Sequence, residues 1–248
     1  APNNSKGLKD NHIIVIFEDS FNNFWLGTEQ GLVFFDREKE EFTHYINNPK
    51  DSKSISSNRV ISINEDSEHN LFIGTYGGGI NKFNHIDKSF IAFREKDGLP
   101  NDVIYGILVD EQNNLWLSTN KGLSKFYQKE NRFENYYIAD GLQDNEFNGG
   151  AYFKNKEGEM FFGGPNGLNI FDPKDIKTNT NIPPILITNF KVYGEEYNLP
   201  EDISVTKEIK LGYKQNYISF EFSALEFSNP NDNEYKYKLE GLEKNWNY

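Results

Sequence analysis

Cysteine is absent from the 248-residue sequence, which excludes disulfide bonds, thiolate metal sites and cysteine nucleophiles. Long apolar runs are also lacking. No stretch approaches the roughly 20 apolar residues that a membrane-spanning helix requires, and residues 1–6 contain no apolar signal core. We therefore expect membrane contact only through segments that are not present in this sequence.

Positive charge is scarce. Lys and Arg number 26 against 38 Asp and Glu, giving a formal net charge of −12. Surfaces that bind nucleic acid concentrate positive charge, so we expect no nucleic-acid partner. Histidine is scarce as well, and the four histidines fall at different phases of the repeat described below: His12, His44, His69 and His85. No metal site and no cofactor are predicted from them.

Aromatic residues are plentiful, at 15%, and they mark an internal repeat. The repeat occurs as NNFWLGTEQGLVFF (22–35), HNLFIGTYGGGINKF (69–83), NNLWLSTNKGLSKF (113–126) and GEMFFGGPNGLNIF (158–171). Its anchoring aromatics, expected in the core, are Trp25, Phe72, Trp116 and Phe161. A period of about 45 residues with several short strands per unit is typical of propeller blades. The sequence therefore predicts an all-β fold built on a β-propeller.

Each repeat has the same internal order. A Gly-Leu type loop ending in Asn or Asp leads into an apolar strand, and a polar turn follows that begins with Asp or Asn. The turn ends with Asn22, His69, Asn113 or Gly158, residue types that tolerate a positive φ. Turn chemistry is favoured over calcium binding, because a calcium loop needs a longer alternation of oxygen ligands. A second strand then ends in Gly-Thr or a variant of it.

The repeats are placed at about 7–53, 54–97, 98–140 and 141–173, within a propeller region of 1–173. Four-stranded units are expected, but the fourth lacks an outer strand because polar residues 174–181 stand in its place. Nothing strand-like precedes the first unit to complete the ring. We therefore expect these blades to be part of a larger propeller that begins upstream of residue 1.

After a linker at 174–184 the repeat period ends and a different β pattern begins. Apolar and polar residues alternate at 185–193, 209–211, 217–222 and 235–239, as in half-buried antiparallel strands. Residues 185–248 are predicted to form the N-terminal part of an immunoglobulin-like β-sandwich, which typically has about seven strands.

The repeat NNLWLSTNKGLSKF, preceded by GLPNDVI, resembles the two-component regulator propeller repeat. The segment YKQNYISFEFSALEFSNPNDNEYKYKLEGLEKNW resembles the spaced-tyrosine (Y_Y_Y) β-sandwich domain that follows such propellers. The resemblance implies the periplasmic sensor region of a sensor histidine kinase, often a hybrid kinase of Bacteroidetes that controls polysaccharide use. It also implies a homodimer in the full-length protein and an inner-membrane anchor outside this sequence.

Strand directions predict where a ligand binds. In an antiparallel blade the start of the first strand and the end of the second lie at the same edge, so the Gly-Leu loops and Gly-Thr turns share one face. Residues on that face that differ between repeats are not required by the repeat structure, so they are the candidates for contacting a ligand. The predicted ligand-binding residues are His12, Glu29, Arg59, Tyr76, Lys121, Glu146 and Asn166. An oligosaccharide is the expected ligand, because tyrosine stacking and a few placed polar groups suit a sugar.

The predicted function is a non-catalytic, extracytoplasmic sensor that relays ligand binding through the sandwich to a downstream kinase. No catalytic residue and no kinase motif are assigned to this portion. One alternative is a propeller enzyme similar to streptogramin lyases, which would need an acid and a base converging on one face. A protein-interaction platform is the other.

Overall fold

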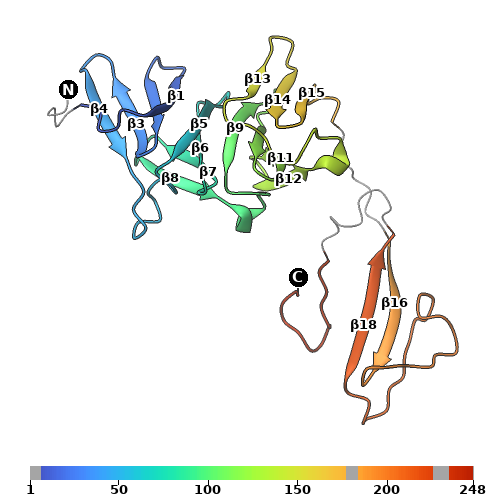
Figure 1. The fold of residues 1–248 in the computed structure, drawn as a ribbon. Helices are drawn as coiled ribbons and strands as arrows, with labels where there is room; N and C mark the ends of the chain where they lie inside the picture. Colours follow the sequence, from blue (N-terminus) through green and yellow to red (C-terminus); the bar gives the residue numbers. More distant parts are fainter. Residues whose placement is uncertain (1–6, 177–183, 226–234, 248) are drawn as a thin grey trace. The chain divides into compact units, whose positions relative to one another are not determined.

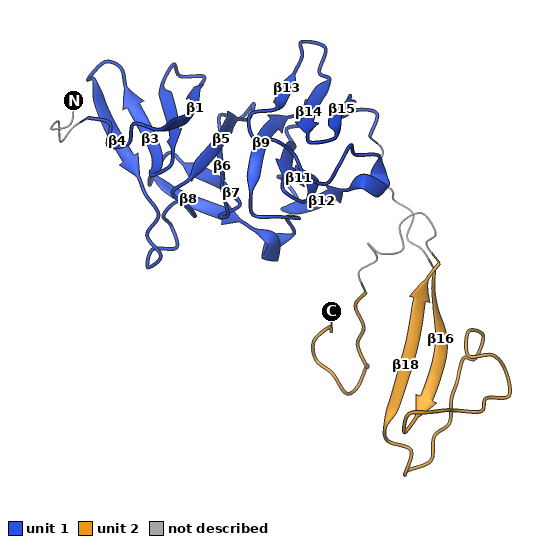
Figure 2. Ribbon diagram, viewed as in Figure 1, with its two compact units in different colours: residues 1–177 blue, residues 178–248 orange. Residues whose placement is uncertain are grey.

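The computed structural model describes residues 7–176, 184–225 and 235–247. The chain divides into two compact units, Ala1–Lys177 and Thr178–Tyr248 (Figure 2). The predicted linker at 174–184 lies partly outside the described residues.

The first unit consists of successive antiparallel sheets, each formed by strands that are neighbours in the sequence (Figure 1). Blade 1 contains β1 (Ile13–Glu18), β2 (Phe24–Thr28), β3 (Gly31–Asp36) and β4 (Glu41–Tyr45). Blade 2 contains β5 (Val60–Glu65), β6 (Leu71–Thr75), β7 (Ile80–Asn84) and β8 (Ser89–Phe93). The predicted propeller blades are therefore present.

Blade 3 contains β9 (Ile104–Val109), β10 (Leu115–Thr119), β11 (Gly122–Tyr127) and β12 (Arg132–Tyr136). Single 3-10 turns, η1 (Glu95–Asp97) and η2 (Ile138–Asp140), follow β8 and β12. Blade 4 contains β13 (Tyr152–Lys154), β14 (Met160–Gly164) and β15 (Gly167–Phe171). Within the described residues blade 4 has no fourth strand, in agreement with the polar sequence after Phe171.

The turns between the first and second strands have the predicted backbone conformation. Their last residues all have positive φ: Asn22 at 61°, His69 at 64°, Asn113 at 68° and Gly158 at 100°. At the ends of the Gly-Leu loops that precede blades 3 and 4, a side-chain carboxylate or amide also makes the expected backbone bond. Asp102 Oδ1 accepts from Glu95 N at 2.9 Å, and Asn145 Oδ1 accepts from Ile138 N at 2.9 Å. Local sequence chemistry thus shapes both ends of the first strand.

Neighbouring blades are joined by apolar side chains at equivalent positions. Ile63 pairs with Ile73 in blade 2 and Ile107 pairs with Leu117 in blade 3, and both isoleucines are buried against the preceding blade. Ile16 holds the same register position in blade 1 but is 62% exposed, because no described residue covers that face. The blade interfaces, rather than single sheets, therefore form the core of this unit.

Three of the four anchoring aromatics are buried as predicted: Trp25 at 2%, Phe72 at 0% and Trp116 at 1% exposure. Phe161 in blade 4 is only half-buried. The prediction was wrong at this position. The first three aromatics pack against a following blade, whereas within the described residues no following blade packs against Phe161. Leu168 and Ile170 of the same blade are exposed for the same reason.

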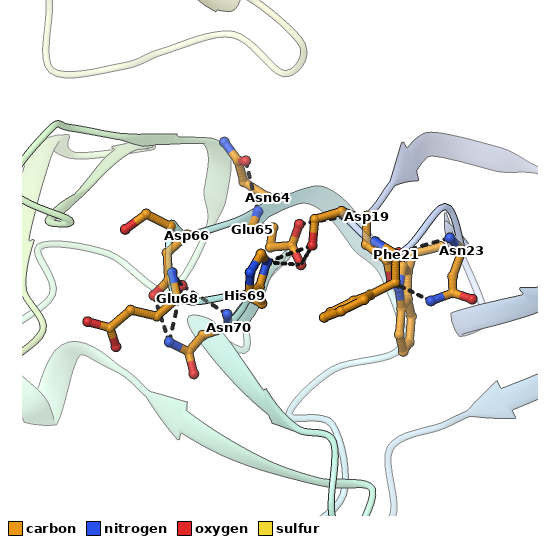
Figure 3. A network of polar contacts seen from close by, with 12 residues as sticks. Asp19, Phe21, Asn23, Asn64, Glu65, Asp66, Glu68, His69 and Asn70 are labelled. Atoms are coloured by element: carbon orange, nitrogen blue, oxygen red, sulfur yellow. Dashed lines mark hydrogen bonds and ion pairs between the residues drawn. The ribbon is translucent and has the colours of Figure 1, made fainter.

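Adjacent blades are also joined through their Asp turns, which are the segments 19–22, 66–69 and 110–113. Figure 3 shows the first two lying side by side, with His69 reaching towards blade 1. Ser20 N donates to Glu65 Oε2 at 2.8 Å, and Ser20 Oγ lies 2.6 Å from His69 Nδ1. The same serine position one blade later, Ser67, donates to Asn113 Oδ1 at 2.9 Å. A repeated polar contact therefore fixes the spacing of successive blades.

The second unit contains one sheet in the order β17-β16-β18, from β16 (Ile185–Val192), β17 (Glu195–Glu196) and β18 (Ile218–Ala224). Two of the four predicted strands agree with β16 and β18. The predicted strands at 209–211 and 235–239 were wrong, since residues 209–211 form no strand and Tyr237 makes only an isolated bridge with Asn247. Alternation of apolar and polar residues indicates that one face of a segment is buried. A strand also requires a neighbouring strand with which to form backbone hydrogen bonds. The sandwich therefore stays a prediction.

Candidate functional site

The loops before the first strands and the turns after the second strands meet on one face of the propeller unit. Tyr76 N donates to Arg59 O at 2.9 Å, and Tyr76 forms a β-bridge with Val103 of the next blade. Gly77 N and Gly79 N both donate to Asp102 O, at 3.1 and 2.8 Å. This face, called the loop face below, is the one that the strand directions predicted.

Three predicted ligand-binding residues converge on the loop face between blades 1 and 2. The guanidinium carbon of Arg59 lies 4.4 Å from the centroid of the Tyr76 ring, a cation–π contact. Arg59 Nε also lies 3.1 Å from Glu29 Oε1. Tyr76 remains 45% exposed. Glu29, Arg59 and Tyr76, named here the Arg59 cluster, thus offer a carboxylate, a cation and an aromatic ring to solvent.

His12 extends the Arg59 cluster at its blade 1 end. His12 Nδ1 lies 3.7 Å from Glu29 Oε1, the same oxygen that Arg59 contacts. The histidine side chain is well exposed, and its backbone N–H donates to Asp10 Oδ1 at 3.0 Å. The carboxylate is therefore shared between two basic side chains, which orients it towards them.

Tyr105 was missed by the sequence analysis and lies beside the Arg59 cluster. Burial raises the pKa of the Tyr105 hydroxyl, and the nearby Tyr76 and Glu146 raise it further. Its hydroxyl donates to Asn120 Oδ1 at 3.3 Å. The sequence predicts only an apolar strand here. The available signal was that blades 1 and 2 have Ile14 and Ile61 at this position, so Tyr105 is the residue that departs from the repeat.

The remaining predicted site residues lie on the loop face but in other blades. Glu146 is exposed and near enough to Tyr105 to influence its pKa. Lys121 is exposed in the blade 3 turn, where its backbone N–H donates to Thr119 Oγ1 at 3.0 Å. Within the described part of the chain its ammonium group has no ion-pair partner. The structure therefore places Lys121 on the loop face without bringing it into the Arg59 cluster.

Asn166 has a local structural contact that the sequence analysis did not foresee. Its side-chain amide donates to Asp144 Oδ2 at 2.6 Å, and its backbone N–H donates to Gln143 Oε1 at 2.8 Å. These bonds tie the second turn of blade 4 to the loop at 141–145. Asn166 therefore keeps that turn in place and has fewer free hydrogen-bonding groups for a ligand.

No group of three or more His, Asp or Glu side chains within residues 7–176, 184–225 and 235–247 is arranged to hold a metal ion. In the same residues no helix is long and apolar enough to cross a membrane. The chemistry of the loop face consists of hydrogen bonding, ion pairing and aromatic stacking.

The family model described as Two component regulator propeller matches residues 7–30, 54–77 and 98–121. Each matched segment begins at a Gly-Leu type loop and ends in the turn after the second strand, so the matches cover the first two strands of blades 1, 2 and 3. The chain contains two-component regulator propeller repeats. These repeats supply both the loops and the turns that form the loop face.

The chain is similar to parts of longer proteins. A protein named histidine kinase P4, from Formosa agariphila, is 31% identical over 258 residues, covering 99% of this chain and 18% of its own length. The extracellular domain of the hybrid two-component system BT3049 from B. thetaiotaomicron is 28% identical with a TM-score of 0.51, covering 95% of this chain and 38% of that one. This chain thus spans less than a fifth of the kinase.

A second solved structure shows the same fold. The extracellular domain of the hybrid two-component system BT4673 from B. thetaiotaomicron has a TM-score of 0.57 and 21% identity, covering 97% of this chain and 44% of that one. At this identity the likeness shows that the two chains share a fold.

Proposed function

We propose that this chain is a non-catalytic part of the extracytoplasmic, periplasmic sensor region of a two-component histidine kinase. Its propeller binds an oligosaccharide on the loop face, and the second unit relays that binding towards a kinase elsewhere in the protein. The observation that carries the proposal is the Arg59 cluster, a solvent-facing ring, cation and carboxylate held where two blades meet. The family match and the named relatives support the two-component assignment.

The chemistry of the Arg59 cluster suits a sugar. The apolar C–H face of a pyranose stacks on an aromatic ring, and the half-exposed Tyr76 offers one. Sugar hydroxyls both donate and accept hydrogen bonds, and Glu29 and Arg59 supply an acceptor and a donor 3.1 Å apart. Lys121 and Asn120 extend the polar surface along blade 3. A chain of several sugar units can contact these groups across adjacent blades.

Signal relay requires a ligand that distinguishes two arrangements of the sensor. In a dimeric receptor, ligand binding shifts the population towards the arrangement that binds more tightly. We propose that two copies of the second unit transmit this shift. The blade interfaces make such a relay physically reasonable, because packed blades move as rigid bodies and do not deform continuously.

A calorimetric screen of the intact sensor region against a glycan panel tests the proposal. We expect one glycan class to bind, and Tyr76→Ala to weaken that binding at least tenfold, or about 1.4 kcal/mol. Tyr213→Ala is the matched control, because Tyr213 is fully exposed in the second unit and should leave affinity unchanged. Absence of binding by any glycan, or equal losses in both variants, would reject the sugar site. Turnover of a bound glycan would favour the enzyme alternative.

A further inference from the structure

The Asp turns of blades 1, 2 and 3 share one carboxylate scheme. In each, Oδ1 of the first residue accepts backbone N–H groups from the third residue of the turn and from the residue that follows the turn. Asp19 Oδ1 accepts from Phe21 N at 3.0 Å and Asn23 N at 2.8 Å, and Asp110 Oδ1 accepts likewise at 3.0 and 2.8 Å. Figure 3 shows the blade 1 and blade 2 examples. The three aspartates are 4–5% exposed, so each is a buried carboxylate.

The second oxygen, Oδ2, accepts from the side-chain amide of an asparagine four residues on in every blade, at 3.1, 2.8 and 3.1 Å, and its further partners differ. In blade 3, Asp110 Oδ2 accepts from Trp116 Nε1 at 3.2 Å and lies 3.7 Å from the ammonium of Lys125. That ammonium lies 5.0 Å from the centroid of the Trp116 ring. In blade 2, Asp66 Oδ2 accepts from Gln128 Nε2 of the next blade at 3.1 Å. Blade 2, where Phe72 offers no indole donor, thus takes a further donor from Gln128, and blade 3 adds an ammonium group to its indole donor.

Blade 1 lacks both of these donors. In blade 3 the strand partner of Trp116 is Lys125. In blade 1 the equivalent partner of Trp25 is Phe34, so an aromatic ring replaces the lysine. His85 stands two residues after Phe83, as Gln128 does after Phe126, yet it makes no hydrogen bond to Asp19 among the described residues. Asp19 Oδ2 accepts from Trp25 Nε1 at 2.9 Å and from Asn23 Nδ2 at 3.1 Å, and it has no ion-pair partner in the described part of the chain.

A cavity of about 290 Å³ lies where the missing donors would be. Its lining from blade 1 is Asp19, Asn23, Trp25, Phe34, Thr43 and Tyr45, and its lining from blade 2 is His85 and Lys88. Trp25 and Tyr45 are stacked, with ring centroids 6.1 Å apart. Lys88 does not neutralise Asp19: its ammonium lies 5.7 Å from the Phe83 ring centroid and forms no ion pair with Asp19. The cavity therefore combines a buried carboxylate with aromatic walls.

We propose that this cavity binds a small primary alkylammonium compound, with the ammonium group at Asp19 and the carbon chain against Phe34 and Tyr45. Lys125 shows the chemistry within the same chain, since its butylammonium side chain lies between an aspartate and two aromatic rings in blade 3. An ammonium ion over an aromatic face beside a carboxylate gains both cation–π and ion-pair attraction. The site follows β1 and so lies at the blade edge opposite the loop face, separate from the Arg59 cluster.

The probe is n-butylamine, which reproduces the side chain of lysine beyond Cα. Titration in phosphate buffer, followed by tryptophan fluorescence and ligand-observed NMR, is expected to show saturable binding with a roughly millimolar dissociation constant. Tris must be avoided because it is itself a primary amine. n-Butanol is the control for cavity filling without charge, and we expect it to bind at least tenfold more weakly.

Two variants locate the site. Phe34→Lys supplies an ammonium group from the chain, so butylamine binding should fall at least tenfold. Lys125→Ala removes the internal ammonium of blade 3 and should add a second equivalent of bound butylamine, which keeps the test decisive if the first variant does not fold. Equal binding of n-butanol and butylamine would overturn the proposal. So would an absence of saturable binding to the unmodified protein, unchanged binding in a folded Phe34→Lys, or unchanged stoichiometry in Lys125→Ala.

Discussion

Replacing Asp110 by alanine is expected to lower the free energy of unfolding of the propeller unit by about 3–5 kcal/mol. Asp110 is 5% exposed and accepts hydrogen bonds from Gln112 N, Asn114 N and the indole of Trp116. Its carboxylate also lies 3.7 Å from the ammonium of Lys125, whose side chain is 9% exposed. The substitution leaves these donors without an acceptor and a buried cation without a partner. Urea denaturation followed by tryptophan fluorescence measures the loss.

Asp19→Ala is the matched control for this experiment. Asp19 has the same three types of donor, but Phe34 replaces the lysine in its blade. In amine-free buffer we expect a smaller loss of about 1–3 kcal/mol, arising from unsatisfied donors alone. The double variant Asp110→Ala/Lys125→Met should recover part of the Asp110 loss, because it removes the stranded charge. Equal losses for Asp19→Ala and Asp110→Ala would show that the buried lysine contributes little.

Ile107→Ala is expected to destabilise the propeller unit by about 2–5 kcal/mol. Ile107 is fully buried and packs in the cluster that joins blades 2 and 3, together with Phe72 and Ile80. Truncation removes apolar contacts and leaves a cavity that packed strands on both sides cannot fill. The shift of the urea midpoint at constant slope reports the change in stability.

Ile16→Ala is the internal control, because Ile16 has the same residue type and the same register. Ile16 pairs with Leu26 as Ile107 pairs with Leu117, yet Ile16 is 62% exposed. Its truncation is expected to cost less than about 1 kcal/mol, since little apolar surface returns to water. A loss as large as that of Ile107→Ala would mean that the exposed face of blade 1 is covered in solution.

Most of the propeller was predictable because its strands and turns are determined by residues close together in the sequence. Asp or Asn at the start of a turn, and Asn, His or Gly at its end, fix the reversal within four residues, and the positive φ angles agree. Each strand finds its partner through a short connection, so register follows from the turn. Repetition strengthened the signal, since three blades independently gave the same strand order. The second unit offered no such repetition, and two of its four expected strands were wrong.

The sequence predicted which residues lie on the loop face better than it predicted which of them contact one another. Strand direction alone places Arg59, Tyr76 and Glu29 at one edge, and the structure brings these three together. Sequence spacing does not show that Asn166 is bonded within its own turn, or that Lys121 stays apart from the Arg59 cluster. Tyr105 was missed because an apolar strand pattern conceals one polar hydroxyl. These distinctions depend on side-chain directions and on the distance between neighbouring blades.

The sequence by itself determined the repeat, the strand order within each blade and the chemistry of the turns, because each depends on residues close together in the chain. Only the tertiary structure decided which of the non-repeating residues touch across blades. It also revealed the cavity beside Asp19, which arises because Phe34 and His85, from different blades, replace a lysine and a glutamine found elsewhere. Such a space depends on packing between segments distant in sequence, which no local pattern specifies.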